Sequence, residues 1–205
     1  YNSGTGVLSL TGLDTVANYQ QVLRTITYNN SSQAPDTTDR SITFVAWLNT
    51  SDSSAATTTV TINSVNDVPI LSATPTNPAM IENDPAADLF NAVTIDTVES
   101  GETIEELVFT VENVTDGNDE IIVIDGENVL LSNTNLLGEL NTGVTLVNNY
   151  AYSVSLVGST ATVTLTTTGT SVANAQTLVD GLAYENSSDN PTTTSRVVTL
   201  TSIKD

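Results

Sequence analysis

The chain lacks several residue types that common protein chemistries require. Its 205 residues include no cysteine and no histidine. Without cysteine there is no disulfide framework, and without either residue type there is no ordinary structural zinc site. The Ser-His-Asp and Cys-His catalytic arrangements are excluded for the same reason. No run of about 18 apolar residues occurs, so the sequence predicts no membrane insertion.

Positive charge is also scarce. The chain has 4 basic and 24 acidic residues, a net charge of −20, and no Lys or Arg lies between Arg40 and Arg196. Nucleic acid is therefore excluded as a partner, because phosphates need Lys and Arg. An anionic membrane surface is disfavoured on the same grounds. Charge of one sign repels itself, and bound divalent cations would relieve that repulsion.

The most informative feature that the chain does contain is an internal repeat. Residues 16–44 and 172–200 align without a gap at an offset of 156. Self-similarity at a fixed period marks an array of like modules, which favours a structural or adhesive protein. The alignment predicts that residues 1–67 are the C-terminal part of one module and that residues 68–205 are a second module. Val65–Pro69 is interpreted as the linker between them.

Each copy of the repeat predicts one short helix. Apolar residues recur at helical spacing after Thr15 and again after Ser171, and each of these residues is a plausible N-cap. In the second copy the apolar face consists of Ala175, Leu178 and Val179 together with Val172 and Leu182. We expect that face to be buried on a sheet.

Alternation of apolar and polar residues predicts strands in the rest of the chain. The predicted strands cover residues 6–12, 40–49, 57–65, 70–73, 79–81, 88–98, 104–114, 120–124, 129–131, 150–156 and 160–166. Asp125-Gly126 and Gly158-Ser159 are turn signals that join the last four into two hairpins. The pattern predicts a mainly β fold of antiparallel β-sandwich modules in tandem, each with one short helix.

The order of these motifs resembles a known family. The residues that carry the resemblance are Thr15–Asn30, Arg40–Phe44, Val65–Pro69, Glu82-Asn83, Leu89-Phe90, Thr94–Glu99, Asp116–Glu120 and Val172–Thr201. They are similar to the cadherin-like tandem repeats, of the chondroitin-sulfate-proteoglycan type, found in giant bacterial RTX-type surface adhesins. The resemblance implies cadherin/Ig-like sandwiches in a secreted, calcium-dependent fibre segment at the bacterial cell surface.

Acidic residues are concentrated in one part of the chain, where residues 82–127 hold 14 of the 24. Calcium takes six to eight oxygen ligands in flexible geometry, and loop carboxylates supply them. The candidate metal ligands are Asp67, Glu82, Asp84, Asp96, Glu99, Asp116, Asp119 and Glu120. As in cadherin linkers, Asp67 would join Glu82 and Asp96 at one tip of the module. The alternative is an acidic surface that is merely solvated.

These features predict an adhesive or structural stalk, made rigid by calcium, that serves adhesion, matrix or filament formation. The main alternative is a lectin-like module that binds carbohydrate or protein. A pair of carboxylates can also hydrolyse glycosides, but such sites usually add aromatic platforms. Trp47 and Tyr152 are better interpreted as core or rim residues, so we expect no enzyme.

Two residue pairs at equivalent repeat positions have structural interpretations. We expect Arg40 and Arg196 to pair with a carboxylate or to cap backbone carbonyls. Tyr28 and Tyr184 are expected to anchor the helix through a hydrogen-bonded hydroxyl.

The phase of the repeat also leaves the second module without a counterpart of the strand at residues 57–65. We therefore expect neighbouring modules or like subunits, arranged head to tail, to complete it. A cell-surface or matrix ligand is a further possible partner.

Overall fold

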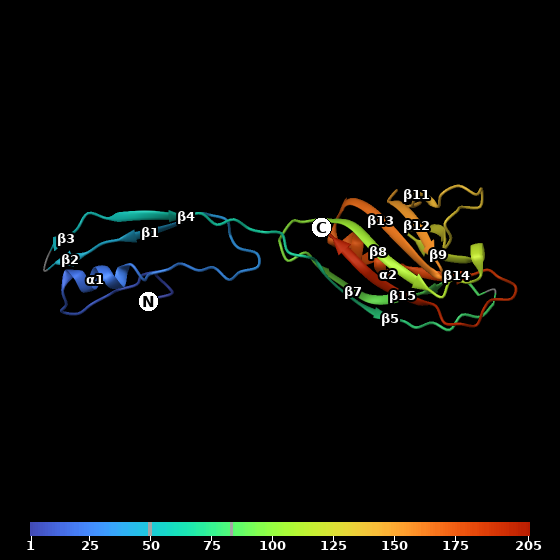
Figure 1. Cartoon of the computed structure of the whole chain (residues 1–205), viewed down its shortest axis with the longest axis horizontal. Helices are drawn as coiled ribbons and strands as arrows, with labels where there is room; N and C mark the ends of the chain where they lie inside the picture. Colours follow the sequence, from blue (N-terminus) through green and yellow to red (C-terminus); the bar gives the residue numbers. More distant parts are fainter. Residues whose placement is uncertain (49–50, 83) are drawn as a thin grey trace.

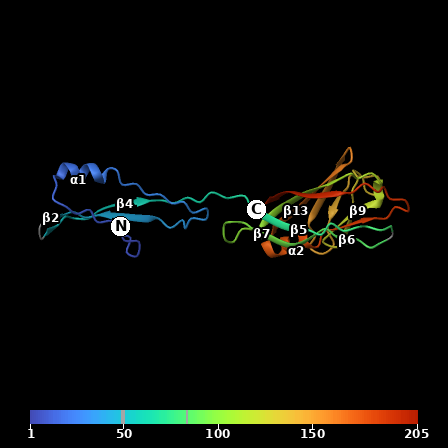
Figure 2. The same cartoon turned by 90° about the horizontal axis from the view of Figure 1, so that it is seen from below.

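The architecture is that of a computed structural model that describes residues 1–48, 51–82 and 84–205. Two parts follow one another along the long axis of the molecule (Figure 1). A view from below shows the same extended arrangement (Figure 2). The first part contains a helix and short strands, and the second contains the larger sheets.

The described residues form two α-helices and one short 3-10 helix: α1 (Val16–Leu23), α2 (Val172–Asp180) and η1 (Gly117–Asp119). Their strands are β1 (Arg40–Phe44), β2 (Trp47–Leu48), β3 (Ser51–Asp52), β4 (Ala56–Val60), β5 (Ile70–Pro75), β6 (Ala87–Asp88), β7 (Phe90–Asp96), β8 (Ile104–Glu112), β9 (Glu120–Ile124), β10 (Glu127–Leu130), β11 (Thr142–Val144), β12 (Ala151–Val157), β13 (Thr160–Thr170), β14 (Ala183–Asn186) and β15 (Val197–Lys204). None of the described helices is long and apolar enough to cross a membrane.

Two main sheets build residues 68–205. One has five strands in the order β11-β12-β13-β8-β15, the other has four in the order β10-β9-β14-β6, and β5 pairs with β7. All of these pairings are antiparallel. Strand β13 shows how the sequence makes the core: its Thr residues alternate with Ala161, Val163 and Leu165, which are buried against the other sheet's apolar residues. The prediction of a mainly β, antiparallel fold is confirmed, and one core shared by both sheets is consistent with a β-sandwich.

Both predicted hairpins form where the sequence places them. Strands β9 and β10 are joined at Asp125-Gly126, with positive φ angles of 48° and 80°. Such angles suit a tight two-residue turn, and Asp followed by Gly adopts them at low cost. Strands β12 and β13 pair from Ala151↔Thr166 to Val157↔Thr160 around Gly158, whose φ is 63°.

Helix α2 connects β13 of the five-stranded sheet to β14 of the four-stranded sheet. It begins as predicted, because the Ser171 side chain accepts a hydrogen bond from the Asn174 amide at 3.2 Å. Leu178 and Val179 are buried in the core together with Leu182, just after the helix, and the helix packs against β7. Helix α1 starts in the same way, with Thr15 capping the amide of Asn18.

Some stretches of the chain form no strand, or a shorter one, where the sequence predicts a strand. Residues 6–12 contribute only an isolated bridge between Asn2 and Val7, and residues 79–81 form no strand, so these two predictions are wrong. The strand predicted at 57–65 is shorter, β4 at Ala56–Val60. Residue 49, where the strand at 40–49 was predicted to end, lies outside the described residues, as does Asn83 of the family resemblance. Alternating sequence needs a neighbouring strand to become a ladder, and the described residues offer none at these places.

Candidate functional site

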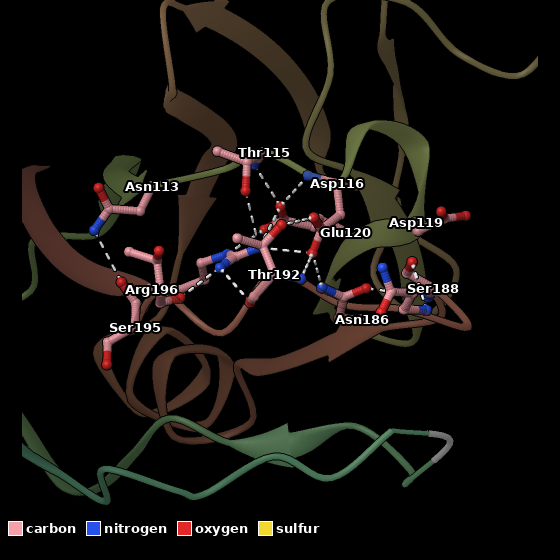
Figure 3. Close-up of polar contacts among 12 residues, drawn as sticks. Asn113, Thr115, Asp116, Asp119, Glu120, Asn186, Ser188, Thr192, Ser195 and Arg196 are labelled. Atoms are coloured by element: carbon pink, nitrogen blue, oxygen red, sulfur yellow. Dashed lines mark hydrogen bonds and ion pairs between the residues drawn. The ribbon is translucent and has the colours of Figure 1, made fainter.

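An arginine at the far end of the second part holds two carboxylates (Figure 3). Arg196 stands just before β15, Glu120 begins β9, and Asp116 precedes the 3-10 helix. The Arg196 Nε atom donates to Glu120 Oε2 at 2.9 Å, and Nη2 donates to Glu120 Oε1 at 2.9 Å and to Asp116 Oδ2 at 2.8 Å. Tyr184, on β14, donates its hydroxyl to Glu120 Oε2 at 2.8 Å. We call these four residues the Arg196 clamp.

Every carboxylate oxygen of the clamp is satisfied. The Glu120 side chain is fully buried, and its Oε1 also accepts the backbone amides of Thr115 and Asp116 at 2.7 and 2.8 Å. Asp116 accepts from the Asn186 side chain at 2.7 Å and from the Thr192 amide at 2.9 Å. A buried charge is tolerated only when it is paired and hydrogen-bonded in this way.

These contacts fix the ionisation of both acids. Burial opposes the charge of Asp116, but hydrogen bonds from Thr192 and Asn186 and the charge of Arg196 outweigh it and lower the pKa to about 2. Burial likewise opposes ionisation of Glu120, yet the hydrogen bonds from Arg196, from two backbone amides and from Tyr184 lower its pKa. The carboxyl groups of Asp116 and Glu120 are therefore ionised across the ordinary pH range.

The same arginine contacts occur in the other copy of the repeat. Arg196 Nη1 donates to the carbonyl oxygens of Thr192, at 3.1 Å, and Thr194. Arg40 donates to the carbonyl oxygens of Asp36, at 3.0 Å through Nη2, and Thr38. Asp36 and Thr38 are the positions 156 before Thr192 and Thr194. The sequence prediction of carboxylate pairing and carbonyl capping is confirmed for Arg196, and that of carbonyl capping also for Arg40.

A second acidic group lies at the junction between the two parts. The Asn66 side chain donates to Asp205 Oδ1 at 3.2 Å, and the Asp67 amide lies 3.4 Å from Glu99 Oε2. Three carboxylate oxygens are buried there without a hydrogen-bond partner: Glu99 Oε1, Glu102 Oε2 and Asp205 Oδ2. We call Asp67, Glu99, Glu102 and Asp205 the junction cluster.

Electrostatics at the junction cluster are unfavourable. Removal from water and the neighbouring charges of Glu99 and Asp205 raise the pKa of Glu102. Ionised carboxylates accept hydrogen bonds but cannot donate them. A hydrogen bond between two of the carboxyl groups of Glu99, Glu102 and Asp205 therefore requires that one of them keeps its proton. Orphaned buried oxygens of this kind call for a proton or a cation.

The structure separates the eight predicted metal ligands into groups. Asp67 and Glu99 meet at the junction, whereas Asp116 and Glu120 bind Arg196 at the other end of the module. The exposed Asp119 points away from Arg196 (Figure 3).

The remaining three predicted ligands do not lie together. Asp96 ends β7 opposite Ile70, at the linker end of the second part, and accepts the amide of Val98 at 2.9 Å. Glu82 and Asp84 lie in the loop between β5 and β6, and Glu82 lines a groove of about 520 Å³ beside Arg196 rather than joining Asp67.

Sequence reasoning missed Glu102 and Asp205. Both are separated in sequence from the linker, and only the fold brings them beside it. The available signal was the acidic stretch itself, which includes Glu102, but nothing local distinguishes this residue from its neighbours. Among the described residues no three acidic side chains already stand in a geometry that would hold a metal ion.

Comparison with protein-family models, with curated proteins and with solved structures finds no match for this chain.

Proposed function

We propose that this chain is a structural segment of an extracellular repeat protein, a stalk or fibre of cadherin-like sandwiches. The observation that carries the proposal is the repeat at an offset of 156, in which two arginines cap equivalent carbonyls and two helices start on equivalent caps. The recurring positions therefore include residues whose contacts maintain the fold. This is what a tandem array of modules requires. A secreted bacterial surface protein that serves adhesion fits this architecture.

Calcium is the proposed cofactor, and the junction cluster is where it would bind. Hard cations prefer carboxylate and amide oxygens, and Glu99, Glu102 and Asp205 each have one buried oxygen without a partner. Asp67 would complete the set from the linker. Calcium would supply there the positive charge that the cluster lacks. The ion would then hold the linker against the second part of the chain. Asp67 lies in the linker, whereas Glu99, Glu102 and Asp205 belong to the second part.

The clamp acids are assigned a different role. Asp116 and Glu120 already have a cation, the Arg196 guanidinium, and their oxygens are filled by hydrogen bonds. We assign them to stability of the fold and not to metal binding. Asp119, close in sequence but exposed, gives a matched control for any test of calcium.

The test compares three proteins with and without calcium: the unchanged chain, the junction variant Glu102→Gln with Asp205→Asn, and the control Asp119→Asn. We expect calcium to raise the melting temperature of the first and third, and chelator to reverse it, while the junction variant responds little. Small-angle scattering should show a narrower range of extended shapes with calcium in the same two proteins. An equal response in all three proteins, or no response in any, would contradict the proposal.

A further inference from the structure

Strand β15 is an edge strand of the five-stranded sheet. In the described part of the chain its ladder partner is β8, paired from Val197↔Glu112 to Lys204↔Glu106, and no strand lies on its other side in the sheet order. Backbone groups on such an edge can accept another strand. An extended segment that adds to a sheet in this way is a known mode of recognition.

An apolar groove lies beside this edge. It has a volume of about 570 Å³ and runs between β15 and β5. Its apolar lining includes Leu71, Ala73 and Phe90 on one side and Val198, Leu200 and Ile203 on the other. Residues 198–203 of β15 all line the groove, and among them Val198 and Leu200 are half-buried and Ile203 is buried. An apolar groove of this size beside an open strand edge could receive one strand with small side chains on its inner face.

The repeat identifies the strand that fits. Strand β1 is the counterpart of the start of β15, since Arg40, Ile42 and Phe44 precede Arg196, Val198 and Leu200 by 156. Strand β1 pairs with β4 in the register Arg40↔Val60, Ile42↔Thr58 and Phe44↔Ala56.

Transferred to β15, this register sets Val60, Thr58 and Ala56 opposite Arg196, Val198 and Leu200. These three residues of β4 share one face of the strand. They are small, which suits the space between β15 and β5.

Strand β4 would lose few stabilising contacts by leaving β1. The two form a two-stranded sheet, and no described residue of 1–67 is buried. A two-stranded ribbon without a covered apolar face is at best marginally stable in water. In the groove, the same strand would keep an equivalent ladder and gain contact with the apolar residues of β5 and β15.

We propose that β4 of one copy of this chain inserts into the groove between β5 and β15 of a second copy, antiparallel to β15. Donor and acceptor surfaces differ, so each copy can donate to one neighbour and accept from another. Contacts of this kind produce open head-to-tail chains rather than closed dimers. This strand insertion deepens the proposed function and rests on one part of it, the stalk of repeated modules. It does not require calcium.

Two structural facts make a site-directed cross-link a sharp test. Thr43 and Thr57 are opposite in the β1–β4 ladder, with Oγ1 atoms 3.1 Å apart, and Thr199 is the repeat counterpart of Thr43. The chain has no cysteine of its own, so introduced thiols are unambiguous. A disulfide forms only between positions whose Cα atoms lie within about 7 Å. It therefore reports the register.

The experiment mixes Thr57→Cys protein with Thr199→Cys protein under mild oxidation in chelator. We expect a covalent heterodimer, and at least about tenfold less of it when Thr59→Cys, two residues along β4, replaces Thr57→Cys. The unchanged chain should also sediment as larger species as its concentration rises. The double variant Thr43→Cys with Thr57→Cys locks β4 to β1, so it should remain a monomer until reductant is added.

Three results would overturn the inference: a monomer at every concentration, cross-linking that ignores the register, or association that survives the locked β1–β4 pair. A peptide or flanking segment as the natural occupant would appear as the first of these. Because the assay runs in chelator, its failure is distinct from failure of the calcium proposal, which changes the melting temperature and not the cross-link.

Discussion

Arg196 and Glu120 form a two-point ion pair, with Nε and Nη2 each 2.9 Å from a different oxygen of the same carboxylate. The fork of the guanidinium matches the carboxylate, which gives the pair a fixed geometry. Through it the loop before β15 is tied to the first residue of β9, and the two sheets are joined at this end of the module.

Removing one partner of this pair should strongly destabilise the second part of the chain. Arg196→Ala leaves the buried Glu120 carboxylate without its cation, and we expect unfolding free energy to fall by about 3–5 kcal/mol. Chemical denaturation followed by circular dichroism measures it. Lys204→Ala, which breaks the more exposed pair with Glu106, is the control and should cost less than about 1 kcal/mol. Similar losses in both variants would mean that the clamp contributes no more than a surface pair.

The clamp also predicts how stability depends on acid. The pKa of Asp116 falls from 3.8 to about 2 on folding, so its contribution is fully present above pH 3.8 and is lost as pH drops toward 2. The lowered pKa of Glu120 acts in the same direction. The melting temperature should therefore decline steeply below about pH 4, and the decline should be shallower in Asp116→Asn. An identical acid limb in that variant would remove Asp116 from the explanation.

Helix α2 and helix α1 offer a matched pair of core tests. Leu178→Ala deletes a buried side chain and should cost about 2–5 kcal/mol. Val22 occupies the same repeat position in α1 but is 46% exposed, so Val22→Ala should cost about 0.5 kcal/mol or less. Denaturant unfolding of each variant measures these two losses of unfolding free energy. A loss below about 0.5 kcal/mol for Leu178→Ala would show that α2 is not held on the sheet in solution.

Calcium should raise the melting temperature more at neutral pH than in mild acid. Without the ion, the raised pKa of Glu102 means that the folded chain retains a proton above the ordinary value of 4.5. The stability linked to that proton is present at lower pH and is lost as pH rises through the raised value. We therefore expect the calcium-dependent rise in melting temperature to grow between about pH 4.5 and 7. A rise that is the same at both values would point to a site without Glu102.

Local signals predicted the local parts of this fold well. Thr15 and Ser171 cap their helices, and Asp125-Gly126 turns its hairpin, because these effects depend on residues only a few positions apart. The alternating residues 6–12 form no strand, because a ladder requires a partner that sequence pattern alone does not supply.

The sites show the same limit of sequence reasoning. Acidic density identified the right stretch of chain, but it could not distinguish Glu120, which is neutralised by an arginine 76 residues away, from Glu99 at the junction. Asp205 was missed because only the direction of β15 carries it back to the linker.

The position of Asp205 beside Asn66 determines how the second part would respond to tension. Residues 66 and 205 lie at the same tip, so a pull between them would open β15 from β8 one hydrogen bond at a time, as a zipper opens. A strand seated along β15 would instead transmit load from one tip of the module to the other. The ladder would then be sheared, with its hydrogen bonds loaded together. The same sheet would thus be weak when pulled from one end and strong once its groove is filled.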